Sequence, residues 1–233
     1  MLVLFLGGNG ANAQKIASGS GAVATFLSHG AAVAVPQGLL PDGERAPNWA
    51  VRDGRRMPRD DLAFLQDVIS DAQARLGVEP VPVLLTGFSR GGSMIWDIAC
   101  QVPAAADAYA PIAGGFWYPE PENCVGPVHL FHTHGFIDRV VPLEGRPVRD
   151  GTRRQGDVFT GLRLWRATNG CGSRADAHEM ADGFWTKHWT NCDAGSVTLM
   201  LHDGGHAVPG DWAETAIDWF EELHFEETQA GQR

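Results

Sequence analysis

No apolar run in this chain approaches the roughly 20 residues that a membrane-spanning helix needs. Positive charge is also scarce, because 18 Lys and Arg stand against 28 Asp and Glu and give a formal net charge of −10. This balance argues against nucleic acid and anionic membrane surfaces as partners, and it favours neutral substrates. We therefore expect a small-molecule or polymeric ligand, no nucleic acid and no membrane span. The sequence does not indicate an oligomeric state.

Cysteine is limited to four residues, and none of them forms a C-x-x-C pair. This absence argues against a structural zinc site and against a thioredoxin-type redox motif. Cys171 and Cys192 bracket a polar, Trp-containing segment, so one interpretation is a bridge between them, with Cys100 and Cys124 as the second pair. Four reduced, partly buried thiols are the other interpretation, and the sequence leaves both open.

The length of 233 residues, 44% of them apolar, suits one α/β domain. We expect this domain over residues 1–225 and a flexible tail over residues 226–233. The chain is apolar from its first residue, with no basic segment and no cleavage site, so residues 2–6 are expected to form a strand rather than a signal peptide. A chain that opens inside its own core predicts that N-terminal strands are missing.

Buried-strand patterns alternate with amphipathic helical patterns along the whole chain. The predicted strands are residues 2–6, 31–35, 81–86, 108–113, 128–132 and 197–202, and the predicted helices are residues 14–28, 60–76, 89–101, 157–168 and 211–223. Such alternation predicts an α/β fold with a mostly parallel sheet and helices on both faces. Ligands of such sheets bind at the carboxyl ends of the strands, so the loops there are the candidates for a site.

Residues 87–91 read G-F-S-R-G and lie between a predicted strand and a predicted helix. A G-x-S-x-G motif in this context is typical of a nucleophile elbow, a tight turn that exposes its serine at a helix N-terminus. The helix dipole and the backbone N–H groups there favour developing negative charge. Ser89 is therefore the candidate nucleophile. The alternative is a glycine-rich turn that happens to contain a serine.

A serine hydroxyl needs an adjacent base, which is usually a histidine oriented by a carboxylate. In this fold the chain order is serine, acid, histidine. His206 follows the last predicted strand on a Gly-Gly turn, and Asp138 follows the preceding strand, so both are expected to lie on the same edge as Ser89. The rival candidates are His202 for the base and Asp203 for the acid.

An oxyanion hole needs two backbone donors. We expect one from the N–H of Arg90, directly after the serine, and the other from the glycine-rich loop after the first strand, with Asn9 as first choice and Gly8 as second. A phosphate-binding loop does not fit these glycines, because no G-K-[ST] follows and no G-x-G-x-x-G opens the helix.

Eight tryptophans are many for this length, and several fall in predicted loops. Exposed tryptophan is a common platform for sugar rings and aromatic acyl groups. The candidate pocket residues are Trp117, Phe116 and Trp49. The alternative for each is packing beneath the long loops.

Four stretches together carry a family resemblance: residues 87–93 (GFSRGGS), 111–117 (PIAGGFW), 134–142 (HGFIDRVVP) and 204–206 (GGH). In combination they resemble the polyhydroxybutyrate depolymerase-like esterases, which are α/β-hydrolases that group with feruloyl and acetyl-xylan esterases. The resemblance spans nearly the whole chain and implies the α/β-hydrolase fold, ester hydrolysis and an extracellular or periplasmic location. The chain departs from the family at residues 7–8, which are Gly-Gly in place of His-Gly, and in lacking an export signal, which makes a cytoplasmic location the alternative.

We therefore expect a serine carboxylic-ester hydrolase that needs neither metal nor cofactor. One alternative is a carbohydrate- or ligand-binding protein of the same fold with weakened catalysis, and another is a serine peptidase. A metal-dependent hydrolase built on His132 and His134, or on His202 and His206, is a remote alternative, because each pair lacks a third ligand. The sequence does not reveal the acyl group, the alcohol, or a preference for polymer or monomer.

Overall fold

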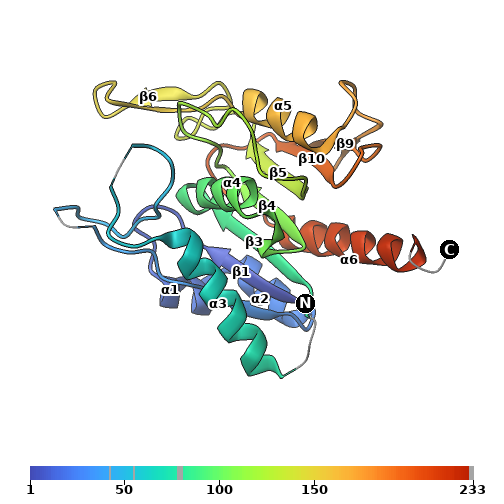
Figure 1. The fold of residues 1–233 in the computed structure, drawn as a ribbon, viewed down its shortest axis with the longest axis horizontal. Coiled ribbons are helices and arrows are strands. Elements are labelled where there is room, and N and C mark those ends of the chain that lie inside the picture. The colour runs from blue at the N-terminus through green and yellow to red at the C-terminus, as the bar shows by residue number, and fades with distance from the viewer. Residues whose placement is uncertain (42, 55, 78–80, 231–233) are drawn as a thin grey trace.

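The computed structural model describes residues 1–41, 43–54, 56–77 and 81–230, with side chains up to residue 223. Its centre is an eight-stranded sheet of order β2-β1-β3-β4-β5-β10-β9-β8 (Figure 1). The parallel strands are β1 (Leu2–Leu6), β2 (Ala32–Ala34), β3 (Val83–Phe88), β4 (Ala108–Ile112), β5 (His129–Gly135) and β10 (Ser196–His202). Two antiparallel strands, β9 (Phe184–Trp189) and β8 (Ala177–Ala181), extend one edge. The predicted mostly parallel sheet is confirmed.

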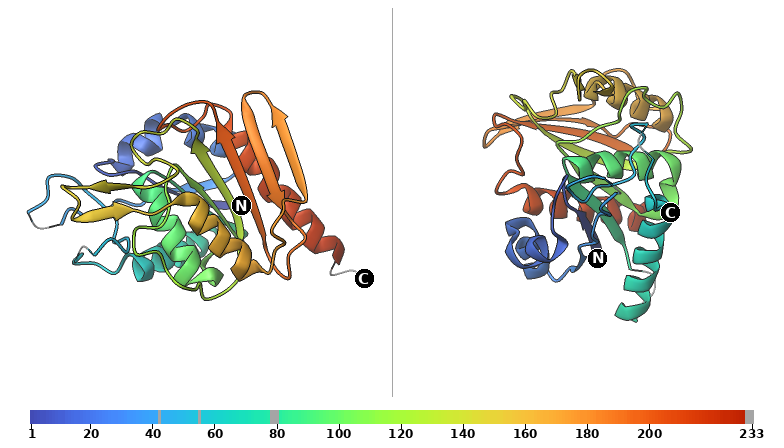
Figure 2. Two further views of the ribbon diagram at one scale, coloured as in Figure 1. Left: turned by 90° about the horizontal axis from the view of Figure 1, so that it is seen from above. Right: turned by 90° about the vertical axis from the view of Figure 1, so that its left-hand side faces the viewer.

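Helices cover both faces of the sheet, as Figure 2 shows in its right-hand view. One face carries α3 (Asp61–Leu76), α4 (Arg90–Gln101) and α5 (Val158–Asn169), and the other carries α1 (Ala13–Gly19), α2 (Gly21–Ser28) and α6 (Trp212–Ala230). Strand β1 is an unbroken apolar run because it is buried on both faces of the sheet. Leu2, Leu4 and Leu6 belong to the first core, whereas Val3 and Phe5 belong to the second.

Several elements differ from the sequence-based prediction. The helix predicted over residues 14–28 is two helices, because Ser20 takes an extended conformation and its side chain accepts a hydrogen bond from the N–H of Val23. The short strands β6 (Arg146–Val148) and β7 (Arg153–Gln155), the 3₁₀ turn Pro103–Ala105 and the hairpin of β8 and β9 were not predicted. Helix α6 continues to Ala230, through part of the predicted tail, and residues 231–233 lie outside the described residues.

The four cysteines form two disulfides, Cys100–Cys124 and Cys171–Cys192. The structure thus adopts the paired interpretation of the sequence and not the four free thiols. The second bridge joins the end of α5 to the segment between β9 and β10, so it ties the antiparallel edge to the helical layer. In the described part of the chain, no helix has the length and apolar character needed to cross a bilayer.

Candidate active site

Ser89 lies in the sharp turn between β3 and α4, with φ 58° and ψ −117°. A non-glycine residue with such a φ is strained, and the surrounding turn has to hold it in place. The turn is this tight because its neighbours lack side chains. A Cβ on Gly91 would lie 2.2 Å from the carbonyl oxygen of Leu6, and a Cβ on Gly87 would lie 2.8 Å from the Gly91 carbonyl carbon. The turn therefore presents the Ser89 hydroxyl at the carboxyl end of β3.

His206 lies between the Ser89 hydroxyl and the Asp138 carboxylate. Its Nε2 is 2.9 Å from the Oγ of Ser89, and its Nδ1 is 2.7 Å from the Oδ2 of Asp138. An ionised carboxylate only accepts hydrogen bonds, so Nδ1–H donates to Asp138 and Nε2 is left to accept from the serine. The Phe88 ring packs against the imidazole with centroids 4.7 Å apart. The structure thus brings together the serine, histidine and aspartate that the sequence singles out.

The Asp138 carboxylate is fixed by its own loop. Its Oδ1 accepts hydrogen bonds from the N–H groups of Val140 and Val141, at 2.8 and 2.9 Å. Burial acts to raise the pKa of Asp138, but the hydrogen bonds from His206, Val141 and Val140 outweigh it and hold the pKa below its usual value. The carboxylate is therefore ionised near neutral pH, as the orientation of His206 requires.

A buried chain of hydrogen bonds supports this loop from beneath. The Nε1–H of Trp96 donates to the Nδ1 of His132 at 3.2 Å, so His132 carries its proton on Nε2 and donates to the Nδ1 of His134 at 3.0 Å. His134 then donates from Nε2 to the carbonyl oxygen of Val141 at 2.7 Å. Burial lowers the pKa of both histidines, so both are neutral. This chain positions Val141, which in turn holds Asp138.

From the sequence, His132 and His134 were considered as a remote metal pair, and this hydrogen-bonded chain was not predicted. The available signal was the spacing of His132 and His134, because residues two apart on a strand share one face. In the described part of the chain, no group of three or more His, Cys, Asp or Glu side chains is arranged to hold a metal ion. The rival base His202 accepts a hydrogen bond from the N–H of Gly204 at 3.1 Å, and the rival acid Asp203 is exposed.

The glycine-rich loop after β1 lies directly beside the nucleophile. A Cβ on Gly8 would be 3.2 Å from the Cβ of Ser89. The Nδ2 of Asn48 donates to the Oδ1 of Asn9 at 2.7 Å, and the N–H of Gly10 donates to the carbonyl of Pro47 at 2.9 Å. The loop that contains Gly8 and Asn9 is therefore fixed beside Ser89, and Arg90 directly follows Ser89 at the start of α4.

Residue 7 has no room for any side chain beyond that of glycine. A Cβ on Gly7 would lie 2.5 Å from the Cβ of Ala11 and 2.6 Å from the Cδ1 of Ile16. The carbonyl of Gly7 accepts a hydrogen bond from the indole of Trp49 at 2.8 Å. The close packing of this loop thus requires glycine at residue 7.

A cleft of about 220 Å³ opens beside Ser89. Its wall is formed by polar residues of the loops and by apolar residues near the Asp138 loop, namely Asn9, Asn48, Ser89, Arg90, Ser93, Trp117, Val140, Val141, Val148, Arg149, Arg153 and Gln155. Of the three candidate pocket residues, Trp117 lines this cleft.

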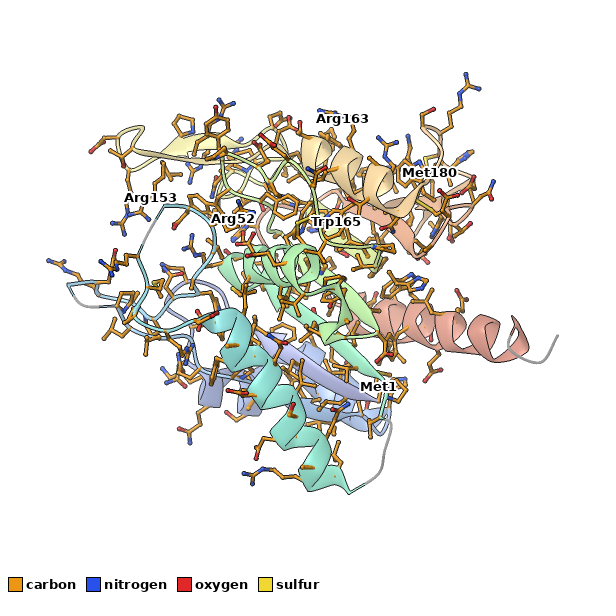
Figure 3. The ribbon with its side chains drawn as sticks, viewed as in Figure 1. Met1, Arg52, Arg153, Arg163, Trp165 and Met180 are labelled. Atoms are coloured by element: carbon orange, nitrogen blue, oxygen red, sulfur yellow. A yellow bond between two sulfur atoms is a disulfide. The ribbon has the colours of Figure 1, made fainter. Side chains whose placement is uncertain are left out.

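The predictions for Phe116 and Trp49 as substrate contacts need correction, because both side chains are in the core. Phe116 is 4% exposed and stacks on Trp165, which lies between α5 and α4 (Figure 3). Trp49 is 1% exposed and braces the glycine loop through Gly7. Both are aromatic residues packed beneath long loops, which is the alternative that the sequence left open.

A second group of side chains is joined to the turn that carries His206. Phe136, Ile137 and Trp185 are all exposed, and the rings of Phe136 and Trp185 meet edge to face with centroids 6.1 Å apart. The N–H of Ile137 donates to the carbonyl of Gly204, so this apolar group is joined to the turn that carries His206. The histidine therefore has an exposed apolar surface near it.

Comparison with known proteins gives similar sequences and similar folds. No protein-family model matches the chain. The chain is 26% identical over 227 residues to a putative esterase, NocK, of Nocardia uniformis, covering 90% of this chain and 65% of that protein. It is 28% identical over 173 residues to feruloyl esterase C of Emericella nidulans, covering 72% of this chain and 56% of that protein. The chain thus spans less than two thirds of the length of both relatives.

Two solved structures share the fold at 14% sequence identity. The acetyl xylan esterase from Aspergillus awamori superposes with a TM-score of 0.64, covering 94% of this chain and 88% of that one. The carboxylesterase from Bacillus cereus superposes with a TM-score of 0.62, covering 95% of this chain and 87% of that one. In fold this chain is therefore an α/β-hydrolase, and in sequence it is similar to the feruloyl esterases.

Proposed function

We propose that the protein is a serine hydrolase of carboxylic esters. The observation that supports this most strongly is the hydrogen-bonded series Ser89, His206 and Asp138, with distances of 2.9 and 2.7 Å. The similarity to feruloyl esterase C and to NocK supports the same reaction class. Arg90 and either Asn9 or Gly8 are the proposed backbone donors to the oxyanion.

In the proposed reaction the Ser89 oxygen attacks the ester carbonyl carbon while its proton passes to the Nε2 of His206. The negative charge on the carbonyl oxygen is stabilised by the backbone N–H groups. The carbon–oxygen bond to the alcohol then breaks, and His206 gives its proton to the departing oxygen. Water repeats the sequence on the acyl-enzyme: His206 takes a proton from the water, the acid leaves, and the proton returns to Ser89.

Asp138 has two parts in this scheme. Its carboxylate holds the imidazole in the tautomer that can accept from serine, and it stabilises the imidazolium that forms. The exposed apolar group of Phe136, Ile137 and Trp185 is joined through Ile137 to the turn that carries His206, the residue that protonates the alcohol in this scheme. We assign this surface to the alcohol part of the substrate.

The two disulfides bear on the compartment in which the protein works. Disulfides persist in oxidising environments and are rare in the cytosol. The pairs Cys100–Cys124 and Cys171–Cys192 support an extracellular or periplasmic location rather than a cytoplasmic one. Labelling of free thiols in protein isolated from its native host tests this assignment, because a cytoplasmic protein would take up four equivalents of reagent.

The test of the function is hydrolysis of 4-nitrophenyl acetate by purified protein and by the Ser89→Ala variant. We expect the substitution to remove turnover by several orders of magnitude, because the nucleophile and its base act as one unit. Ser18→Ala is the matched control, since Ser18 is exposed on α1 and its hydroxyl donates to the carbonyl of Gln14 in the same helix. Full activity of Ser89→Ala would exclude the proposal. A feruloyl ester, a hydroxybutyrate oligomer and a peptide amide as further substrates separate the possible reactions.

A further inference from the structure

The cleft beside Ser89 has a wall of unusual charge for this protein. Three arginines, Arg90, Arg149 and Arg153, line it, and among the described residues of its lining no carboxylate occurs. The whole chain carries a net charge of −10. A positive cleft in an acidic protein concentrates anions at one place, since the walls focus the field into the cavity.

The buried carboxylate of Asp53 holds two of these arginines in place. The Oδ2 of Asp53 accepts from Arg90 at 2.9 Å and from Arg153 at 3.2 Å, and the Asp53 side chain is fully buried. The Asp53 carboxylate thus fixes both guanidinium groups at the cleft. Arg153 reaches Asp53 from strand β7 toward the loop that contains Arg52 (Figure 3).

Arg149 completes the positive wall from the turn between β6 and β7. Its backbone has φ 48°, which a non-glycine residue seldom adopts. Its guanidinium is 3.0 Å from Glu44, and its side chain is 54% exposed. The hairpin of β6 and β7 thus brings Arg149, from its turn, and Arg153, from β7, to the same cleft.

The position of His206 determines which part of an ester enters this cleft. His206 must protonate the departing alcohol, so the alcohol lies against the imidazole and the acyl group points away from it. Ser89, Arg90 and Asn9 line the cleft, whereas His206 does not. The cleft is therefore on the acyl side of the nucleophile.

The lining of the cleft contains two kinds of side chain, which match two parts of an acyl group. Val140, Val141, Val148 and Trp117 provide an apolar wall for a short methylene chain. The guanidinium groups of Arg149 and Arg153 can donate charge-assisted hydrogen bonds to a terminal carboxylate. On the basis of the proposed ester hydrolysis, we propose that the preferred substrates are half-esters of dicarboxylic acids, with the free carboxylate bound by the arginines. This specificity differs from the neutral substrates that the net charge predicts.

The test uses two substrates of nearly equal size, mono-4-nitrophenyl adipate and 4-nitrophenyl hexanoate. They differ in that a carboxylate replaces the terminal methyl group of the acyl chain. We expect kcat/KM for the adipate half-ester to exceed that for the hexanoate by roughly tenfold or more, the effect of one charge-assisted hydrogen bond. The preference should fall as salt is added, because screening weakens partly exposed charges.

The double variant Arg149→Gln/Arg153→Gln should remove the preference by raising KM for the adipate half-ester. Arg75→Gln is the matched control, because Arg75 pairs with Asp71 on the exposed surface of α3 and should leave the ratio of the two substrates unchanged. An equal or lower kcat/KM for the adipate half-ester in the wild-type protein would overturn the inference. Hydrolysis of both esters without a preference for the adipate half-ester would refute only the proposed specificity. Failure to hydrolyse either ester would count against the proposed ester hydrolysis itself.

Discussion

Replacement of Asp138 by asparagine separates the orienting role of the carboxylate from its structural role. The Oδ1 of Asp138 accepts from Val140 and Val141, and an amide oxygen can keep both bonds. The Oδ2 accepts from the Nδ1–H of His206 at 2.7 Å, and an amide nitrogen at this place donates instead. His206 would then carry its proton on Nε2, where it cannot accept the proton of Ser89.

The expected result for Asp138→Asn is a fall in kcat for 4-nitrophenyl acetate of about 10⁴, which corresponds to about 5.5 kcal/mol of transition-state stabilisation. The free energy of unfolding, from urea titration, should stay within about 2 kcal/mol of the wild type because the loop bonds remain. Asp203→Asn is the control, since Asp203 is exposed and should tolerate the change. A kcat of Asp138→Asn within tenfold of the wild type would refute the assigned role.

Two further predictions concern stability. Burial lowers the pKa of His132 and His134, so below about pH 6.5 the unfolded chain binds protons that the folded chain does not. The free energy of unfolding therefore falls as the pH falls. Burial also raises the pKa of Asp97 to about 6, and the proton that the folded chain then binds there offsets part of this loss. Urea titration should show a loss of about 1 to 2 kcal/mol between pH 7.5 and 5.5, and an unchanged or rising value would contradict the buried neutral pair. Replacing both Cys171 and Cys192 by serine should cost about 3 kcal/mol, given a sequence separation of 21 residues. An unaltered thermal midpoint in a calorimeter would speak against this bridge.

The sequence predicted the sheet well because most of its strands are buried on both faces. Such strands appear as unbroken apolar runs, and β1 and β3 are examples. The strands β6 and β7 escaped prediction because they have three residues each, β6 contains a proline and β7 carries only polar side chains. Strand β8 is exposed along its whole length, so it shows no apolar periodicity.

The candidate site was found from the sequence where a local motif fixed the backbone. Glycine is required on both sides of Ser89, because a Cβ at residue 87 or 91 would lie 2.8 or 2.2 Å from backbone atoms. The G-x-S-x-G spacing shows this requirement in the sequence. The pocket residues had no such signal. Trp49 and Phe116 fall in loops by sequence, yet long-range packing buries both, and sequence spacing does not record which side of a loop faces the core.

The arginine wall and the histidine chain depend on contacts between distant segments. Asp53 and Arg153 are 100 positions apart, and Trp96 and His132 are 36 positions apart. Neither pair has a local pattern that links it. Only the three-dimensional arrangement shows that these residues surround the nucleophile.

In the proposed reaction, His206 activates the Ser89 hydroxyl. Reaction with a 4-nitrophenyl alkylphosphonate tests it most directly, because only an activated serine displaces nitrophenolate from phosphorus. We expect one equivalent of nitrophenolate to be released for each chain and the added mass to lie on the peptide that contains Ser89. In the His206→Ala variant, labelling should be slower by several orders of magnitude. Unlabelled protein, or a label on any other residue, would contradict it.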